Sequence, residues 1–232
     1  MRPHSTAILS ACLLATSPLP ASDPVPTAAS PTTPSLDRES IRRLTAEGAA
    51  AFAAADWPRA RRTFQSLLRL DPNNPRVLSN LGAVSFQEHD YKEAILRLEE
   101  ALRGDPTLVR TWETLGMAYH RDGQSMLAVS CLTRAAALEP REPRIHNELA
   151  VVLLGLGWTR GAERSLHTAV ELDPEYAEAH YNLALMYLAR DSPSPELARR
   201  HYLQAVALGV PKDSEFERDL EEANAKVYQQ PD

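Results

Sequence analysis

A period of 34 residues runs through most of this sequence. An acidic residue followed by proline recurs at this interval, at Asp71-Pro72, Asp105-Pro106, Glu139-Pro140 and Asp173-Pro174. A small residue recurs in the same frame, at Gly48, Gly82, Gly116, Ala150 and Ala184. A row of alanines follows, at Ala60, Ala94, Ala128 and Ala162. Because several independent rows share one frame, the sequence predicts a tandem array of similar units rather than one closed globule.

Each unit has the pattern of a helical hairpin. In the second unit, Leu81 and Gly82 place a large and a small side chain on one face of a first helix. Ala94, Leu98 and Ala101, at spacings of four and three, form the apolar stripe of a second helix. The acid-proline pair then ends that helix, because proline cannot continue a helix and restrains the residue before it. No apolar row alternates with the period of two that a strand needs, so the pattern predicts an all-α fold.

The third unit carries nearly every position of a known repeat signature, namely Trp112, Leu115, Gly116, Tyr119, Ala128, Leu132, Ala135 and Pro140. In these residues the chain resembles the tetratricopeptide repeat (TPR) family. The resemblance implies an all-α, right-handed superhelical solenoid of five helix-turn-helix repeats, closed by a C-terminal capping helix. The repeats are expected at residues 41–74, 75–108, 109–142, 143–176 and 177–211.

Residues 212–232 are predicted to form the capping helix and a tail. Ser214 and Glu217 have the spacing of a capping box, which marks the start of a helix. One face of this helix is apolar and consists of Phe216, Leu220, Ala223 and Val227. We expect this face to cover the last repeat, because the end of a repeat array needs a terminal unit with a polar outer side.

The start of the chain has the pattern of an exported protein. Residues 1–21 have a charged start, a short apolar core and small residues after it, as a secretory signal peptide does. Residues 22–40 are rich in Pro, Ser and Thr and are predicted to be a disordered linker. The apolar core is too short to span a bilayer, so no direct membrane span is expected. The predicted location is the periplasm or the cell envelope.

A lipid anchor is the alternative to cleavage near Ala21. Cys12 follows Leu9, Ser10 and Ala11, and this segment resembles the lipobox of bacterial lipoproteins, in which the cysteine becomes the lipidated first residue. The apolar run continues after Cys12, unlike a lipobox. The two interpretations predict different mature N-termini.

Composition and motifs favour a protein without chemistry of its own. The formal net charge of -6 and the lack of basic clusters argue against a nucleic-acid partner. No phosphate-binding, hydrolase or zinc-protease motif occurs, so neither enzymatic activity nor a cofactor is expected. His146 and His180 share a repeat position, but equivalent residues of stacked helices lie about 10 Å apart. A shared metal needs ligands within about 2 Å, so no metal site is predicted. Cys131 is expected to be a small core side chain.

The family resemblance places ligand contacts on the first helix of each repeat. The expected partner-binding groove consists of Phe52, Phe86, Met117, His120, Val151 and Leu154, flanked by Ala49, Ala83, Leu185 and Leu188. A polar edge accompanies it, formed by Arg42, Arg76, Arg110, Arg144, Asn80 and Asn182. An apolar row of this kind suits an amphipathic helix or an extended peptide. Coverage of the same row by the protein itself is the alternative for repeats four and five.

These features predict an exported, non-catalytic scaffold or adaptor that binds a protein or peptide partner. One alternative is a lipid-anchored TPR assembly factor for outer-membrane or pilus biogenesis. Another is a self-associating structural module whose groove accepts a neighbouring copy. The fold alone does not choose among these functions.

Overall fold

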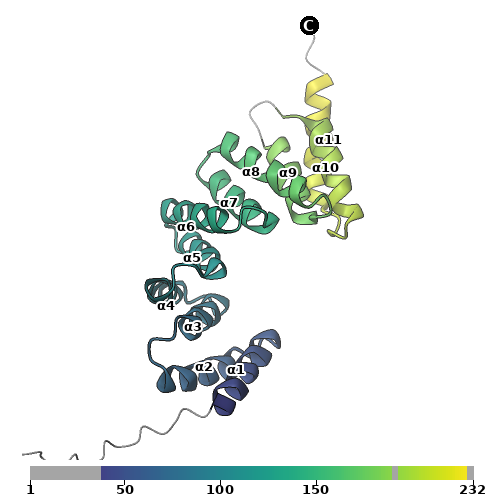
Figure 1. The fold of residues 1–232 in the computed structure, drawn as a ribbon. Coiled ribbons are helices and arrows are strands. Elements are labelled where there is room, and N and C mark those ends of the chain that lie inside the picture. The colour runs from purple at the N-terminus through teal and green to yellow at the C-terminus, as the bar shows by residue number, and fades with distance from the viewer. Residues whose placement is uncertain (1–37, 190–192, 229–232) are drawn as a thin grey trace, which may run out of the picture. The chain divides into compact units, whose positions relative to one another are not determined.

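The computed structural model describes residues 38–189 and 193–228, which form eleven α-helices and no strand (Figure 1). The helices are α1 (Arg38–Ala53), α2 (Trp57–Leu70), α3 (Pro75–Gln87), α4 (Tyr91–Gly104), α5 (Val109–Arg121), α6 (Ser125–Leu138), α7 (Pro143–Gly155), α8 (Thr159–Leu172), α9 (Ala177–Leu188), α10 (Pro195–Ala207) and α11 (Ser214–Tyr228). None of these helices is both long and apolar enough to cross a membrane. The predicted signal peptide, with Cys12, lies outside the described residues.

Successive helices pair into five hairpins, from α1 with α2 to α9 with α10, and each second helix also packs against the first helix of the next hairpin. The acid-proline pairs end the second helices as predicted. The N–H of Asp71 donates to the carbonyl of Leu67 (3.0 Å) as the last bond of α2, and the following proline prevents further turns. The all-α solenoid of helix-turn-helix repeats is thereby confirmed.

The first helix begins at Arg38, inside the segment that the sequence assigned to the linker. Glu39 lies in its first turn, where a negative charge is favourable at the positive end of the helix dipole. Two later first helices, α3 and α7, begin at Pro75 and Pro143. Proline is tolerated there because the N–H that it lacks would have no partner within the helix.

The row of small residues allows the paired helices to approach closely. A Cβ atom built on Gly82 would lie 2.6 Å from Cγ of Leu98, and one on Gly116 would lie 2.8 Å from Cγ of Leu132. Both leucines are fully buried, so they have little room to move aside. The glycines therefore meet a packing requirement of the hairpin.

The turn inside each of the first four hairpins uses a left-handed backbone residue at the same repeat position. The residues and their φ angles are Ala55 (54°), His89 (63°), Gly123 (83°) and Gly157 (73°). Glycine adopts this conformation without steric cost, whereas in alanine and histidine the Cβ atom makes it unfavourable. Repeats one and two therefore hold mild backbone strain that repeats three and four lack.

The C-terminal helix α11 packs against α9 and α10 and completes the last core cluster. Phe216 stacks on Tyr202 with ring centroids 4.5 Å apart, and Leu220 and Ala223 are buried beside it. The side chain of Val227 lies outside the described residues. The predicted capping box is wrong, because Asp213, and not Ser214, accepts hydrogen bonds from the first N–H groups of α11.

Candidate functional site

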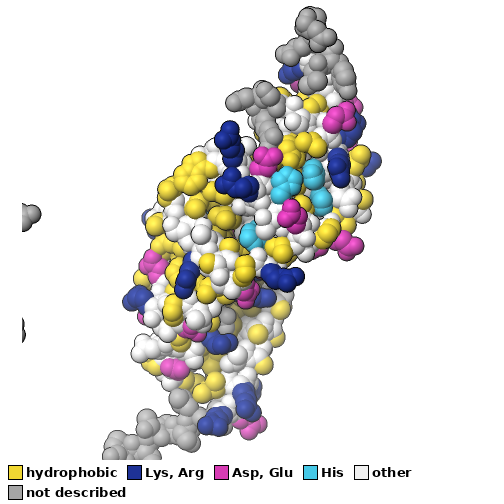
Figure 2. All heavy atoms as spheres, turned by 45° about the horizontal axis from the view of Figure 1, so that its top comes forward, with side chains coloured by type: hydrophobic (Ala, Val, Ile, Leu, Met, Phe, Trp, Pro, Cys, Tyr) yellow, Lys and Arg dark blue, Asp and Glu magenta, His cyan; other side chains and the backbone are white. Residues whose placement is uncertain are grey.

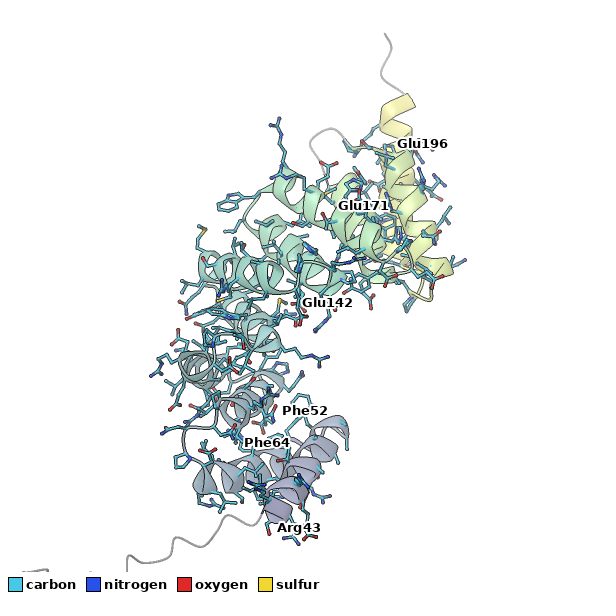
Figure 3. The ribbon with its side chains drawn as sticks, in the orientation of Figure 1. Arg43, Phe52, Phe64, Glu142, Glu171 and Glu196 are labelled. Atoms are coloured by element: carbon cyan, nitrogen blue, oxygen red, sulfur yellow. The ribbon has the colours of Figure 1, made fainter. Side chains whose placement is uncertain are left out.

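The first helices of repeats one to four line a cavity of about 530 Å³, which we call the groove. Its apolar side includes five residues that the sequence placed there, namely Ala49, Phe52, Ala83, Phe86 and Met117. Phe64 from α2 also contributes, and Figure 3 shows Phe52 and Phe64 close together beside α3. The polar side includes Asn80, Arg110, Glu113, Arg144 and Glu148. The groove therefore has an apolar and a charged side.

Two of the three phenylalanines that line the groove, Phe52 and Phe86, are half-buried and held by neighbouring rings. The ring of Phe52 meets Trp57 edge-on, with centroids 5.1 Å apart. The ring of Phe86 lies 5.8 Å from that of Tyr91 and packs against the central core cluster. Each ring is fixed on one side and accessible on the other, so a partner would find it already ordered.

The charged side is built around two carboxyl groups that face each other from α5 and α7. The guanidinium of Arg144 lies 2.7 Å from the carboxyl of Glu113 and 4.0 Å from that of Glu148. The side chains of Glu113 and Glu148 are only 4% and 18% exposed. Such burial penalises the ionised form of a carboxyl group.

Burial raises the pKa of both carboxyls. It raises the pKa of Glu148 to about 8, and the neighbouring charge of Glu113 adds to the effect. The pKa of Glu113 also rises, although the guanidinium of Arg144 opposes the change. The two carboxyls are hydrogen-bond neighbours, so burial and their mutual repulsion favour a protonated form of the pair.

The predicted polar edge divides into residues inside and outside the groove. Arg110, Arg144 and Asn80 line the groove, whereas Arg42 and Arg76 are exposed and do not. The amide of Asn182 donates to the side-chain oxygen of Asn147 (2.8 Å), which ties α9 to α7. The predicted row of arginines is therefore not one continuous surface.

The second half of the predicted apolar row also lies outside the groove. His120, Val151 and Leu154 are partly buried and do not line the cavity. Leu154 packs against the C-terminal core cluster, as Leu188 does, whereas Leu185 is 39% exposed. Burial lowers the pKa of His120, so its neutral form is favoured inside the protein.

Glu113 and Glu148 are not among the residues predicted from the sequence, although the sequence holds a signal for them. Glu148 occupies the repeat position of Asn80 and Asn182, two residues of the predicted polar edge. Glu113 occupies the position of Asn147 one repeat earlier. Two acids at neighbouring inward-facing positions of adjacent repeats indicate a carboxyl pair between two stacked helices.

A second polar cluster joins α8, α9 and α10, where Figure 2 shows histidine side chains gathered on one face. Nε2 of His180 lies 3.0 Å from the carbonyl oxygen of Pro174, so that nitrogen carries the proton and donates. Nδ1 of His180 then accepts from Nδ1 of His201 (3.0 Å). His167 bonds Tyr187 nearby (3.0 Å). Among the described residues, no group of three or more His, Cys, Asp or Glu side chains is arranged to hold a metal ion.

His146 and His180 are partly buried at equivalent repeat positions and make equivalent hydrogen bonds. Nε2 of His146 bonds the carbonyl of Pro140 (2.9 Å), as that of His180 bonds Pro174. Trp112 uses its indole N–H in the same way on Pro106 (2.9 Å). Cys131 is 6% exposed, and burial raises the pKa of its thiol to about 11, so it is an unreactive core residue.

Solved structures with this fold are proteins of the same repeat type. PilF of Pseudomonas aeruginosa matches with a TM-score of 0.70 and 19% identity, over 83% of this chain and 86% of that one. MamA from Desulfovibrio magneticus RS-1 matches with a TM-score of 0.65 and 21% identity, over 76% and 98%. YrrB, described as a TPR protein with an unusual peptide-binding site, matches with a TM-score of 0.63 and 22% identity, over 80% and 94%.

No curated protein sequence matches the chain. The family model for the tetratricopeptide repeat matches residues 45–108 and 153–209, which is more than half of the sequence. The repeat period, the helical hairpins and this match all indicate the same type of repeat. The chain belongs to the tetratricopeptide repeat family.

Proposed function

We propose that this protein is a non-catalytic scaffold or adaptor that holds a segment of another protein in the groove. Its family and the fold that it shares with YrrB support a role in protein interaction. The groove is the site that the geometry favours, because apolar and charged side chains from four first helices line one cavity. A segment with one apolar and one polar face, either helical or extended, suits this arrangement.

The proposal rests on how the rings of Phe52 and Phe86 are held within the groove. Both rings are held by neighbouring aromatic side chains and yet line the open cavity. An ordered ring loses little side-chain entropy when a partner binds, so more of the contact energy appears as affinity. An aromatic anchor in such a setting commonly contributes about 2 kcal/mol or more.

Quantitative capture from native envelope extract tests the proposal. We expect wild-type protein to retain a partner that Phe86→Ala loses while Phe86→Ala keeps its helical circular dichroism spectrum. Trp158→Ala is the matched control, because Trp158 is an exposed aromatic residue, 47% accessible, outside the groove. The proposal fails if Phe86→Ala and wild type retain the same proteins in equal amounts.

We also propose that the protein acts outside the cytoplasm, in the periplasm or cell envelope. The support is the signal-like pattern of residues 1–21. Mass spectrometry of the mature protein distinguishes a cleaved signal peptide from a lipid anchor. A free N-terminus near Ser22 indicates cleavage by signal peptidase, and a diacylated Cys12 indicates a lipid-anchored assembly factor. An intact Met1 on the mature protein would contradict both.

A further inference from the structure

We infer that a second site, separate from the groove, takes an aromatic side chain of a partner protein. The site is a cavity of about 360 Å³ between α4, α5 and α6, which we call the side cavity. Ligand cavities commonly have about 300–1,000 Å³, so this one suits a group of about the size of one ring. No described residue lines both the side cavity and the groove. A partner can therefore occupy the side cavity without displacing a segment from the groove.

The side cavity has an apolar floor and a polar rim. Leu102, Leu115 and Cys131 form the floor and are buried, with exposed fractions of 7%, 3% and 6%. Glu99 and Ser130 lie at the rim and are exposed. An aromatic side chain with a polar tip suits such a site, because its ring is apolar and its tip can stay in contact with water or polar groups.

The repeat duplicates this place between α8, α9 and α10. Cys131 lies three residues after the first buried alanine of α6, and His201 lies three residues after the first buried alanine of α10. Tyr119 of α5 corresponds to Tyr187 of α9, two repeats later. The protein therefore carries a histidine at the position where the side cavity has a cysteine.

In the C-terminal repeats an imidazole ring packs at this place. The ring of His201 stacks on that of Tyr187, with centroids 5.8 Å apart and planes inclined by 19°. Nε2 of His167 lies 3.0 Å from the hydroxyl of Tyr187. An amino-acid side chain with a planar ring and polar atoms is therefore the kind of group that this place accommodates.

Repeats two and three keep the surroundings of that ring but lack the ring itself. The hydroxyl of Tyr119 donates to the carboxylate of Glu99, and these two residues hold the repeat positions of the bonded tyrosine and histidine in the C-terminal repeats. Cys131 has no ring, and the side cavity lies beside it. A ring supplied by a partner can stack on Tyr119 there, as the protein's own imidazole stacks on the equivalent tyrosine.

Methyl NMR of the full chain tests the side cavity with p-cresol, which is the side chain of tyrosine. Its control is 4-methylcyclohexanol, which has the same heavy atoms in a saturated ring. We expect p-cresol to shift the methyl signals of Leu115 and Leu127 and to bind about fivefold more tightly than the control, because a ring pair adds to the effect of burial. N-acetyltyrosinamide should bind as p-cresol does, since the expected occupant is attached to a backbone. Absence of p-cresol binding, equal affinity for the control, or exclusion of N-acetyltyrosinamide overturns the inference.

Two variants copy other repeats of the same chain. Cys131→His should place an imidazole on Tyr119 and lower the affinity for p-cresol about tenfold or more. Cys131→Ser is the matched control, because it has nearly the same size and leaves the side cavity open, so its affinity should equal that of wild type. Tyr119→Leu copies Leu153 of repeat four and should remove the preference for p-cresol over 4-methylcyclohexanol. This second variant decides the question if Cys131→His loses its helical circular dichroism spectrum. Wild-type affinity in folded Cys131→His, or an unchanged preference in Tyr119→Leu, shows that the inference is wrong.

Discussion

The first two repeats and the last two place the same helix position in different surroundings. Phe52 and Phe86 line the groove, whereas Leu154 and Leu188, at the equivalent positions of repeats four and five, pack against the C-terminal core cluster. Phe216 and Leu220 of α11 belong to that cluster. The repeat therefore determines the direction of a side chain, and the neighbouring helices determine whether it stays accessible.

The middle of the array and its C-terminal end shift the proton affinity of their buried titratable groups in opposite directions. The carboxyl pair between α5 and α7 binds protons more tightly than free glutamate does, because burial raises the pKa of Glu148 to about 8. The histidine pair between α9 and α10 binds them less tightly, because burial and the charge of His180 lower the pKa of His201 to about 4. A rise and a fall in pH should therefore weaken different parts of the molecule.

The largest expected difference concerns two phenylalanines. Phe216 is 3% exposed and stacks on Tyr202, so Phe216→Ala should cost about 3–5 kcal/mol through lost contacts and a cavity. Phe86 is half-buried, so Phe86→Ala should cost about 1 kcal/mol. Urea denaturation measures both losses, and hydrogen exchange should show faster opening of α9–α11 in Phe216→Ala only. Equal losses would mean that the groove belongs to the core as much as the C-terminal cluster does.

The next effect is a loss of stability as pH rises from about 4.5 to about 8. Because Glu148 binds a proton in the folded state up to about pH 8 but in the unfolded state only below about 4.5, stability falls as pH rises between these values. We expect about 2 kcal/mol of this loss to disappear in Glu148→Gln, which cannot ionise. The comparison is made by urea denaturation of both proteins at several pH values. Parallel curves would show that Glu148 ionises normally.

The histidine pair should respond to acid with a smaller effect. The folded state resists protonation of His201 down to about pH 4, whereas the unfolded chain accepts a proton near 6.5. Stability is therefore lost as pH falls through this range, by about 1 kcal/mol for a half-buried group screened by solvent. His201→Phe keeps the stacking on Tyr187 and removes the titration. Hydrogen exchange at low pH should localise the opening to α9–α11 in wild type, and a uniform response would contradict this prediction.

The fold could be predicted from the sequence because each determining feature is local and repeated. The acid-proline pairs end helices through backbone geometry, and Gly82 and Gly116 mark the close contacts of two hairpins. The start of α11 was misassigned because Ser214 and Asp213 are both good capping residues. The choice of Asp213 also depends on its tertiary bonds with Tyr181 (2.5 Å) and Tyr202 (2.8 Å).

The candidate site was predicted only in part, because accessibility depends on contacts between repeats. The sequence predicted Phe52, Phe86 and Met117 for one surface, and all three line the cavity, since the repeat frame gives their direction. It did not separate them from Val151 and Leu154, because no local pattern shows which neighbouring helices cover a residue. The carboxyl pair depends on two positions 35 residues apart in the sequence, one more than the period, and a search for equivalent positions does not join them.

The smallest expected effect compares the hairpin turns of repeats one and four. Ala55 adopts a left-handed conformation that Gly157 adopts in repeat four, and an added Cβ on Gly157 would meet no atom within 4 Å. The glycine is therefore needed for its backbone freedom and not for space. Ala55→Gly should stabilise the protein by about 0.5 kcal/mol, because the relief of strain exceeds the added entropy of the unfolded chain. Gly157→Ala should destabilise it by about 1 kcal/mol. Thermal unfolding measures both changes. Opposite signs are required, since a loss in both variants would mean that Ala55 is not strained and that the two turns are not equivalent.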